Sequence, residues 1–341
     1  MAIRPADVSV VVQGPITGSA NDPARQRLTH RCLESIRHHL PESEIILSTW
    51  IGSDVSGLSF DVLVENEDPG ATPVYIEFQQ VNNMNRQIVS TRSGLQQVSR
   101  PLVLKFRTDL ELLGTNVLGL FRKYTARCDE WKIFKDRIVS STLYAMNPRR
   151  FVPLAFHPSD WCFFGNREDV IHLWDLPLQP EPETSQWFSC PPGVDLPWLR
   201  KRTCRYAPEQ YLWTSCLGKH GQIDFDHFAD IRSDNIGLSE LTIANNLALV
   251  SLRQWQVRYL KGKRGTWRDI NLFSVYTHGE WLSLYKKYCD PAARVPLCDP
   301  RSWLNRLFYF FYFPKPTLGN TTPRDGAQSA AAIRCRETVD S

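Results

Sequence analysis

The first hundred residues alternate between two hydrophobic patterns, and this alternation restricts the fold more than any other feature of the chain. A β-branched run, Val8–Gln13, is stopped by Gly14-Pro15, as expected for a central parallel strand that meets its loop. Apolar residues at helical spacing follow over 29–40, and Glu44–Trp50 is a second strand pattern. Strands that alternate with helices predict a parallel sheet with helices on both faces.

The same alternation continues through a short strand pattern over 61–64, a helix over 83–97 and a strand over 101–106. The chain has 341 residues, 42% of them hydrophobic, which is enough to bury a large core. We therefore predict an α/β fold with a Rossmann-type, mostly parallel sheet flanked by helices. This domain is expected over residues 1–245, followed by a C-terminal helical and aromatic extension over 246–315 and a disordered tail over 316–341.

Charge and cysteine content exclude several classes of protein. The 40 basic residues are nearly matched by 36 acidic ones, so a nucleic-acid partner is not expected. The sequence goes directly from Met1 into a strand pattern without the apolar run of a signal peptide. Nine cysteines without a CxxC pair indicate free thiols in a reducing compartment. These features predict a cytoplasmic protein.

An acidic turn follows the strand over 101–106, where open α/β sheets collect their ligands. Asp109 and Glu111 form an acidic pair with the spacing to hold Mg²⁺ or Mn²⁺ and, through it, a diphosphate. A second reading has no metal, and Lys105 and Arg107 offset the phosphate charge. In a third reading Asp109 caps the turn and Arg107 makes an ordinary ion pair.

Two other segments are candidates for contact with the same nucleotide. Gln13 and Gly14 close the first strand, where glycine permits close backbone approach to a base or ribose, although a simple turn explains them equally well. Arg86 lies on the helix before the strand over 101–106, and its guanidinium fork suits a phosphate. Its neighbours Asn85 and Gln87 are either further ligands or part of a solvated helix face.

Five ordered segments carry a resemblance to a known family. They read VVVQGPI, EIILSTWIG, NNMNRQIVSTRSGL, VLKFRTDLEL and HPSDWCFFGN, and together they resemble the WavE family of lipopolysaccharide-synthesis proteins over roughly residues 8–245. The resemblance implies a GT-A-like fold and a glycosyltransferase that uses a nucleotide-sugar donor. Enzymes of that class hold the metal with an Asp-x-Asp element. This chain departs from the pattern, because Arg107 stands where a first carboxylate is expected.

The resemblance also suggests an acceptor side. Asp160, followed by aromatic residues, resembles the acceptor segment of sugar transferases and is a candidate catalytic base. Glu209 is the rival base, although a carboxylate in the first turn of a helix also fits a purely structural role. His157 is a weaker candidate as a metal ligand. A later acidic and imidazole-rich stretch over 220–227 is a secondary metal candidate that also fits a plain strand.

The amino-acid composition changes after about residue 246, where basic residues are interleaved with aromatic ones. The aromatic segment from Trp303 to Lys315 is too short to span a bilayer but suits contact with a membrane surface. Covering the core of the main domain is the alternative. The first reading predicts a peripheral protein at the inner face of the cytoplasmic membrane.

The sequence thus predicts a glycosyltransferase that moves a sugar from a nucleotide-sugar to a lipopolysaccharide or related glycan, with a lipid-linked or oligosaccharide acceptor. Two alternatives stay open: a nucleotidyl or phosphosugar transferase that uses the same edge of the sheet, and a non-catalytic scaffold for polysaccharide assembly at the membrane.

Overall fold

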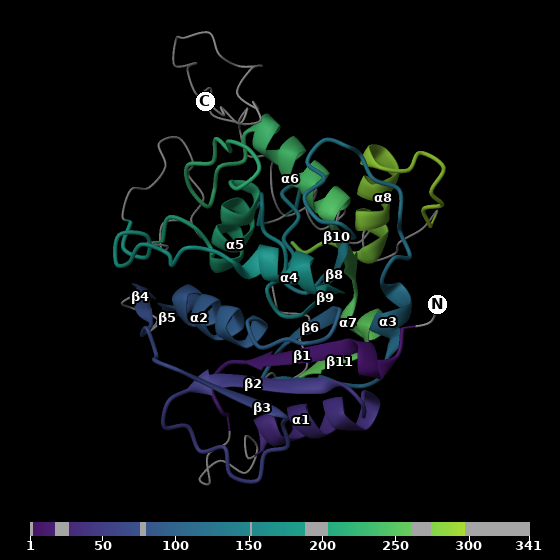
Figure 1. Cartoon of the computed structure of the whole chain (residues 1–341). Coiled ribbons are helices and arrows are strands. Elements are labelled where there is room, and N and C mark those ends of the chain that lie inside the picture. Colours follow the sequence, from purple (N-terminus) through teal and green to yellow (C-terminus); the bar gives the residue numbers. More distant parts are fainter. Residues whose placement is uncertain are drawn as a thin grey trace, which may run out of the picture.

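The computed structural model describes residues 3–17, 27–75, 80–150, 152–187, 204–260 and 274–296. The predicted aromatic segment from Trp303 to Lys315 and the predicted disordered tail lie outside these residues. The centre of the fold is a single large sheet (Figure 1). Its strands, in chain order, are β1 (Val8–Gln13), β2 (Glu44–Trp50), β3 (Val62–Asn66), β6 (Leu102–Arg107), β8 (Ile138–Ser141), β9 (Phe163–Asn166) and β10 (Leu247–Val250).

The order of the seven strands across the sheet is β10-β8-β9-β6-β1-β2-β3. Neighbouring strands pair in parallel except at β9, which is antiparallel to both β6 and β8. The prediction of a mostly parallel Rossmann-type sheet is therefore confirmed. From β1 the chain adds β2 and β3 on one side and β6 on the other, so the strand order reverses between β1 and β6.

Helices cover both faces of the sheet (Figure 1). On one face α1 (Leu28–His39) packs with a small two-stranded antiparallel sheet of β7 (Leu110–Leu112) and β11 (Val257–Tyr259), beside α3 (Asn116–Leu120) and α7 (Leu252–Trp255). The helices that share a core with the other face are α2 (Met84–Leu95), α4 (Arg167–Trp174), α5 (Pro208–Leu217), α6 (Ser233–Asn246) and α8 (His278–Tyr288). A short 3-10 helix, η1 (Pro5–Asp7), precedes β1, and β4 (Thr72–Tyr75) pairs with β5 (Gln80–Asn82).

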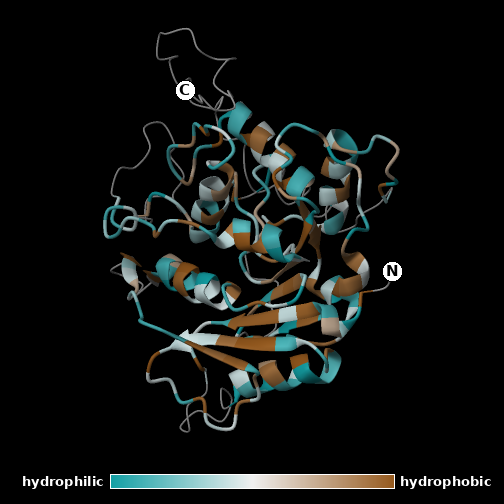
Figure 2. Cartoon of the chain, viewed as in Figure 1, coloured by the Kyte–Doolittle hydropathy of each residue, from teal (hydrophilic) through white to brown (hydrophobic). Residues whose placement is uncertain are grey.

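The two cores follow from the alternation of side chains along the strands. Val11 belongs to the core under α2, whereas Val10 and Val12 belong to the core under α1. All six residues of β1 are buried, as expected for a central strand covered on both faces. Figure 2 shows mostly hydrophobic colouring along the central strands, while the helices also carry many hydrophilic residues.

Small residues let α2 approach the sheet closely. A Cβ added to Gly94 would lie 2.5 Å from Val11 Cγ1 and 3.2 Å from Ser48 Cβ, so only glycine fits at this contact. The approach brings the buried hydroxyl of Ser90, one turn earlier, against the end of β1. Packing of the helix thus shapes the edge of the sheet where the predicted ligand site lies.

Residues beyond the predicted domain boundary at 245 contribute to the main sheet. β10 begins at Leu247, directly after α6, and pairs in parallel with β8. The aromatic residue Trp255 is fully buried in the core under α1. Within the part of the chain that the structure describes, no helix combines the length and apolar character needed to cross a membrane.

Candidate active site at the carboxyl edge of the sheet

The loops after β1 and β6 meet where the strand order reverses. Gln13 and Arg107 are register partners at the ends of the two strands. The Thr108 amide donates to the Gln13 carbonyl over 3.2 Å, and the Thr108 hydroxyl donates to the Pro15 carbonyl over 2.9 Å. Gly14 has a φ of +125°, and a Cβ there would lie 3.1 Å from the Thr108 hydroxyl oxygen. The backbone of β1 therefore turns tightly at the position where such sheets bind nucleotides.

The carboxamide of Gln13 is held in place by the helix above it. The Ser90 hydroxyl donates to Gln13 Oε1 over 2.8 Å, and the Gln13 residue is only 4% exposed. Its amide nitrogen has no acceptor among the residues that the structure describes. A fixed carboxamide with a donor left over is suited to recognising an acceptor on a ligand.

The predicted acidic turn contains an ion pair. Arg107 binds both carboxylate oxygens of Asp109, with its Nε 3.0 Å from Oδ1 and its Nη2 2.7 Å from Oδ2. The guanidinium also lies over the ring of Trp161, 4.8 Å from its centroid. Burial alone would lower the pKa of the Arg107 guanidinium, but the negative charge and hydrogen bonds of Asp109 have the larger effect and raise it. Asp109 is almost fully buried, whereas a quarter of the Arg107 side chain is exposed, so Arg107 is the member of the pair that a ligand can reach.

Glu111 occupies a different environment, in strand β7. Nη2 of Arg31, in α1, lies 3.2 Å from Oε2 of Glu111. Nε of Arg258, the register partner of Glu111 on β11, donates to the same oxygen over 2.6 Å. A cation bound to Asp109 and Glu111 together would compete with the arginine partners of both carboxylates. The residues that the structure describes contain no group of three His, Cys, Asp or Glu placed to hold a metal. The assignment of Asp109 and Glu111 as metal ligands stays a prediction.

The three predicted residues of α2 make different contacts. Arg86 binds both oxygens of Asp68, at 2.7 and 2.6 Å, and this pair is partly exposed. Asn85 exchanges two hydrogen bonds with the backbone of Gln179, at 3.0 and 2.7 Å, which ties α2 to the loop after α4. Gln87 Oε1 is buried and has no partner within the described part of the chain. Of the three predicted residues, Arg86 is thus the one with a charged group near solvent.

Lys105 connects β6 to the predicted acceptor segment. Its side chain is fully buried, and its Nζ donates to the backbone carbonyl of Asp160 and lies 4.7 Å from the ring centroid of Trp174. Burial lowers the pKa of Lys105 to about 8. The carboxylate of Asp160 itself is buried, and its Oδ1 has no hydrogen-bond partner among the described residues. A buried carboxylate oxygen without a partner is costly unless a ligand or water completes it.

The rival base, Glu209, lies in the first turn of α5 and pairs with His157. The Glu209 Oε2 is 3.4 Å from His157 Nε2, and both side chains are mostly buried. The next residue, Gln210, donates to the carbonyls of Ala155 and Phe228 and so fixes the start of α5 against the loop before Asp160. The structure therefore brings the start of α5 to the segment that contains Asp160.

With this geometry in place, the comparison with known proteins is informative. The family model described as WavE lipopolysaccharide synthesis matches residues 8–307. The chain belongs to the WavE family. No curated protein matches it. The family match extends past the region in which the sequence motifs lie and includes β10, which belongs to the seven-stranded sheet, as well as α7, β11 and α8. Membership in the WavE family implies a role in lipopolysaccharide biosynthesis.

In this WavE family member some of the predicted site residues converge. Those from the ends of β1 and β6 do so, because Gln13, Gly14, Arg107 and Asp109 surround the point where the strand order reverses. Three other predicted residues bind partners outside this group. They are Asn85 and Arg86 on α2 and Glu111 on β7.

The secondary metal candidate over 220–227 is dispersed. His220 lies 2.7 Å from His172, while Asp224 and Asp226 pair with Arg232 and Arg205 at 2.8 and 3.0 Å. The fourth member, His227, stacks on Trp187. The segment is an irregular loop, so the plain strand considered as its alternative is wrong.

Two residues that shape the edge of the sheet are absent from the sequence prediction. Ser90 holds the Gln13 carboxamide, and Thr108 joins the loops after β1 and β6. The spacing of Ser90 and Gly94, both small and on one helix face, indicates that α2 lies close to the sheet. Thr108 carries no such signal, because its acceptor is a proline carbonyl 93 residues away in the chain.

Proposed function

We propose that this WavE family member is a glycosyltransferase that moves a sugar from a nucleotide-sugar to a glycan acceptor in lipopolysaccharide synthesis. The observation that carries the proposal is the meeting of Gln13, Gly14 and the Arg107–Asp109 pair at the point where the strand order reverses. Open α/β sheets bind nucleotides in the crevice at that point. The family match supplies the biosynthetic context.

The donor side of the site requires a cation and a hydrogen-bond donor, and both are present. Arg107 has the exposed part of its guanidinium available for a diphosphate, while Asp109 holds it in position. Gln13 lies at the same edge, and its amide nitrogen suits a base or ribose oxygen. Arg86 is the second candidate for the phosphates, since its pair with Asp68 is partly exposed and therefore of low cost to rearrange.

The transfer itself needs one carboxylate. The acceptor hydroxyl oxygen forms a bond to the anomeric carbon and gives its proton to the carboxylate. The bond between that carbon and the phosphate oxygen breaks, and its electron pair leaves with the nucleoside diphosphate. Asp160 suits this role because one of its oxygens lacks a partner, whereas Glu209 already faces His157.

The donor site is tested by thermal stability in the presence of a panel of nucleotide-sugars and nucleoside diphosphates, each with and without Mn²⁺. We expect at least one ligand to raise the melting temperature of the wild-type protein. Arg107→Gln should abolish that rise. Arg100→Gln is the matched control, because Arg100 is exposed at the opposite end of β6. A panel that never changes the melting temperature would favour the non-catalytic scaffold.

The same panel tests whether a metal ion takes part in donor binding. Asp109→Ala should abolish any dependence of donor binding on Mn²⁺, and a Mn²⁺ effect that survives this change excludes Asp109 as a ligand. Glu111→Gln is the companion variant, since it removes charge from the second predicted ligand while keeping its shape.

The identity of the catalytic base is tested with a nucleotide-sugar that the wild-type protein binds. Asp160→Asn should reduce turnover by about 10²–10⁴-fold, the usual contribution of general base catalysis, while leaving nucleotide binding intact. Glu209→Gln should have the smaller effect, and the reverse order would make Glu209 the base. Release of the nucleoside diphosphate from the nucleotide-sugar identifies sugar transfer, and release of a nucleoside monophosphate identifies phosphosugar transfer. Release of pyrophosphate from a nucleoside triphosphate, added in a parallel reaction, identifies nucleotidyl transfer.

A further inference from the structure

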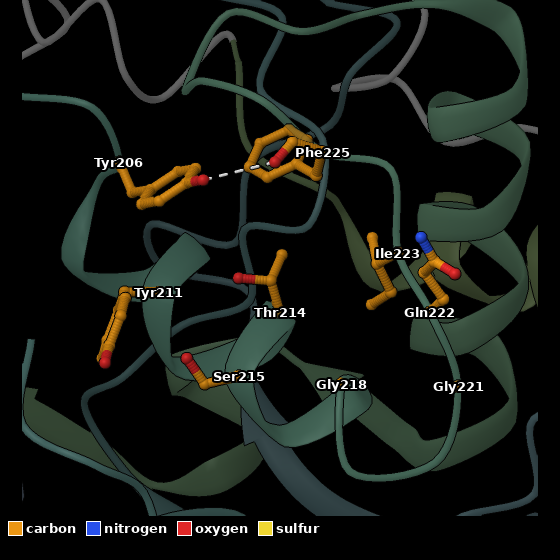
Figure 3. A pocket seen from close by; sticks show the side chains of 9 residues that line it. All are labelled: Tyr206, Tyr211, Thr214, Ser215, Gly218, Gly221, Gln222, Ile223 and Phe225. Atoms are coloured by element: carbon orange, nitrogen blue, oxygen red, sulfur yellow. Dashed lines mark hydrogen bonds between the residues drawn. The ribbon is translucent and has the colours of Figure 1, made fainter. Parts of the chain in front are cut away.

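A hollow of 440 Å³ opens beside α5, outside the edge of the sheet where the candidate active site lies (Figure 3). Tyr206 and Phe225 form one wall, and Tyr211, Thr214 and Ser215 come from one face of α5. The volume falls within the roughly 300–1,000 Å³ of small-molecule sites. Neither the family match nor the sequence motifs assign a role to this hollow.

The wall of the hollow combines aromatic rings with neutral polar groups. The rings of Tyr206 and Phe225 stack at 5.6 Å with an angle of 22°, and the Tyr206 hydroxyl donates to the Phe225 carbonyl over 3.3 Å. Thr214 donates its hydroxyl hydrogen to the Gln210 carbonyl over 2.7 Å. Both hydroxyl oxygens therefore keep lone pairs for a ligand, and the exposed carboxamide of Gln222 adds donors.

The lining residues favour an uncharged ligand. Among the described residues that line the hollow none carries a charge. The Arg205 guanidinium lies 5.1 Å from the ring centroid of Tyr206, but it is paired with Asp226 at 3.0 Å. Aromatic surface beside hydroxyl and amide groups suits a sugar ring, which presents C–H groups and hydroxyls together. A second hollow of 480 Å³ lies between α2 and α4, but Arg167, Glu168 and Asp175 line it and it lacks a large aromatic wall. The two hollows thus differ in the chemistry they can bind.

The hollow is joined to the candidate active site through α5. Phe225 packs edge-on against Phe156 at 5.1 Å, and the next residue, His157, pairs with Glu209 in the first turn of α5. Thr214 lies five residues further along the same helix, which corresponds to about 8 Å along the axis. Glu209, a candidate base, and the hollow therefore lie along one helix, and a glycan of several sugar units is long enough to cover this separation.

We propose that this hollow binds a neutral sugar unit of the acceptor glycan, remote from the sugar that receives the transferred residue. The proposal rests on the proposed function, because it assigns the hollow to the acceptor of that transfer. It adds a substrate class: the recognised unit is uncharged, in contrast to the diphosphate of the donor.

The test is saturation-transfer NMR with lactose, cellobiose and N,N′-diacetylchitobiose on the full chain. We expect at least one of these neutral disaccharides to show transfer from the wild-type protein. Thr214→Val and Gln222→Leu should weaken its binding by about tenfold or more, in line with the loss of one or two ligand hydrogen bonds. Gln96→Leu is the matched control, because Gln96 is an exposed glutamine of the second hollow.

Three results overturn the proposal: no transfer to any of the disaccharides, transfer that both variants leave unchanged, or stronger binding of the charged sugar N-acetylneuraminic acid at the same site. Binding of uridine diphosphate, measured on the same samples, separates this failure from failure of the proposed function. Loss of disaccharide binding with retained nucleotide binding concerns the hollow alone. Disaccharide binding without any nucleotide binding leaves the hollow standing and removes the donor site.

Discussion

The buried lysine of β6 provides the sharpest test of how the candidate site is held together. Lys105 is fully buried, and burial lowers its pKa from 10.5 to about 8. Below pH 8 the lysine is protonated in both the folded and the unfolded chain. Between pH 8 and 10.5 the unfolded chain holds the proton that the folded Lys105 has lost, so the contribution of Lys105 to the free energy of unfolding rises with pH in this window.

The size of the rise follows from the two pKa values. The interval from 10.5 to about 8, at about 1.4 kcal/mol for each pH unit, gives about 3 kcal/mol. Lys105→Met removes this titration while keeping the length of the side chain. The variant loses the hydrogen bond to the Asp160 carbonyl at every pH, but that constant cost cancels when two pH values are compared.

The assay is urea unfolding of the wild-type and Lys105→Met proteins at pH 7 and at pH 10.5. We expect the stability difference between them to shift by about 3 kcal/mol in favour of the wild type at the higher pH. Lys132→Met, at an exposed position, controls for the removal of a lysine as such. A stability difference that is the same at both pH values would refute the reasoning, because it would mean that Lys105 does not lose its proton early in the folded protein.

Three further predictions concern packing, charge and the membrane. Gly94→Ala should destabilise the protein by about 1–3 kcal/mol, because its Cβ would meet a β1 side chain at 2.5 Å, while Gly119→Ala, with open space around it, should be neutral or slightly stabilising by thermal unfolding. Arg107→Met should cost about 3 kcal/mol in urea unfolding because it removes the ion-pair partner of the buried Asp109, and Arg107→Met with Asp109→Leu should recover most of it. Deletion of residues 303–315 should abolish flotation with anionic liposomes, and unchanged flotation would exclude this segment as an anchor.

The strands of the central sheet are predictable because their signal is local. Val8–Gln13 and Glu44–Trp50 have the predicted bounds, since a continuous β-branched or apolar run buried on both faces needs no distant partner to be recognised. The contacts of Glu111, in contrast, come from residues that are distant in the sequence. Its partner Arg258 lies 147 residues away on a strand of three residues, and no spacing rule in the sequence predicts that pairing. The same limit explains why the pairing of His157 with Glu209 emerges only from the fold.

Strand β6 connects the proposed donor and acceptor sides of the candidate site. Its Lys105 holds the Asp160 carbonyl, and its Arg107 lies over the ring of Trp161, so two basic residues of one strand fix the acceptor segment. Immediately after the strand, Thr108 donates to the loop that follows β1. The position of Asp160 relative to the nucleotide edge is therefore set by a single buried strand rather than by two independent loops. Since a rigid strand transmits displacement to both sides, we expect substitutions within β6 to change donor and acceptor binding together, whereas substitutions in α5 change acceptor binding alone.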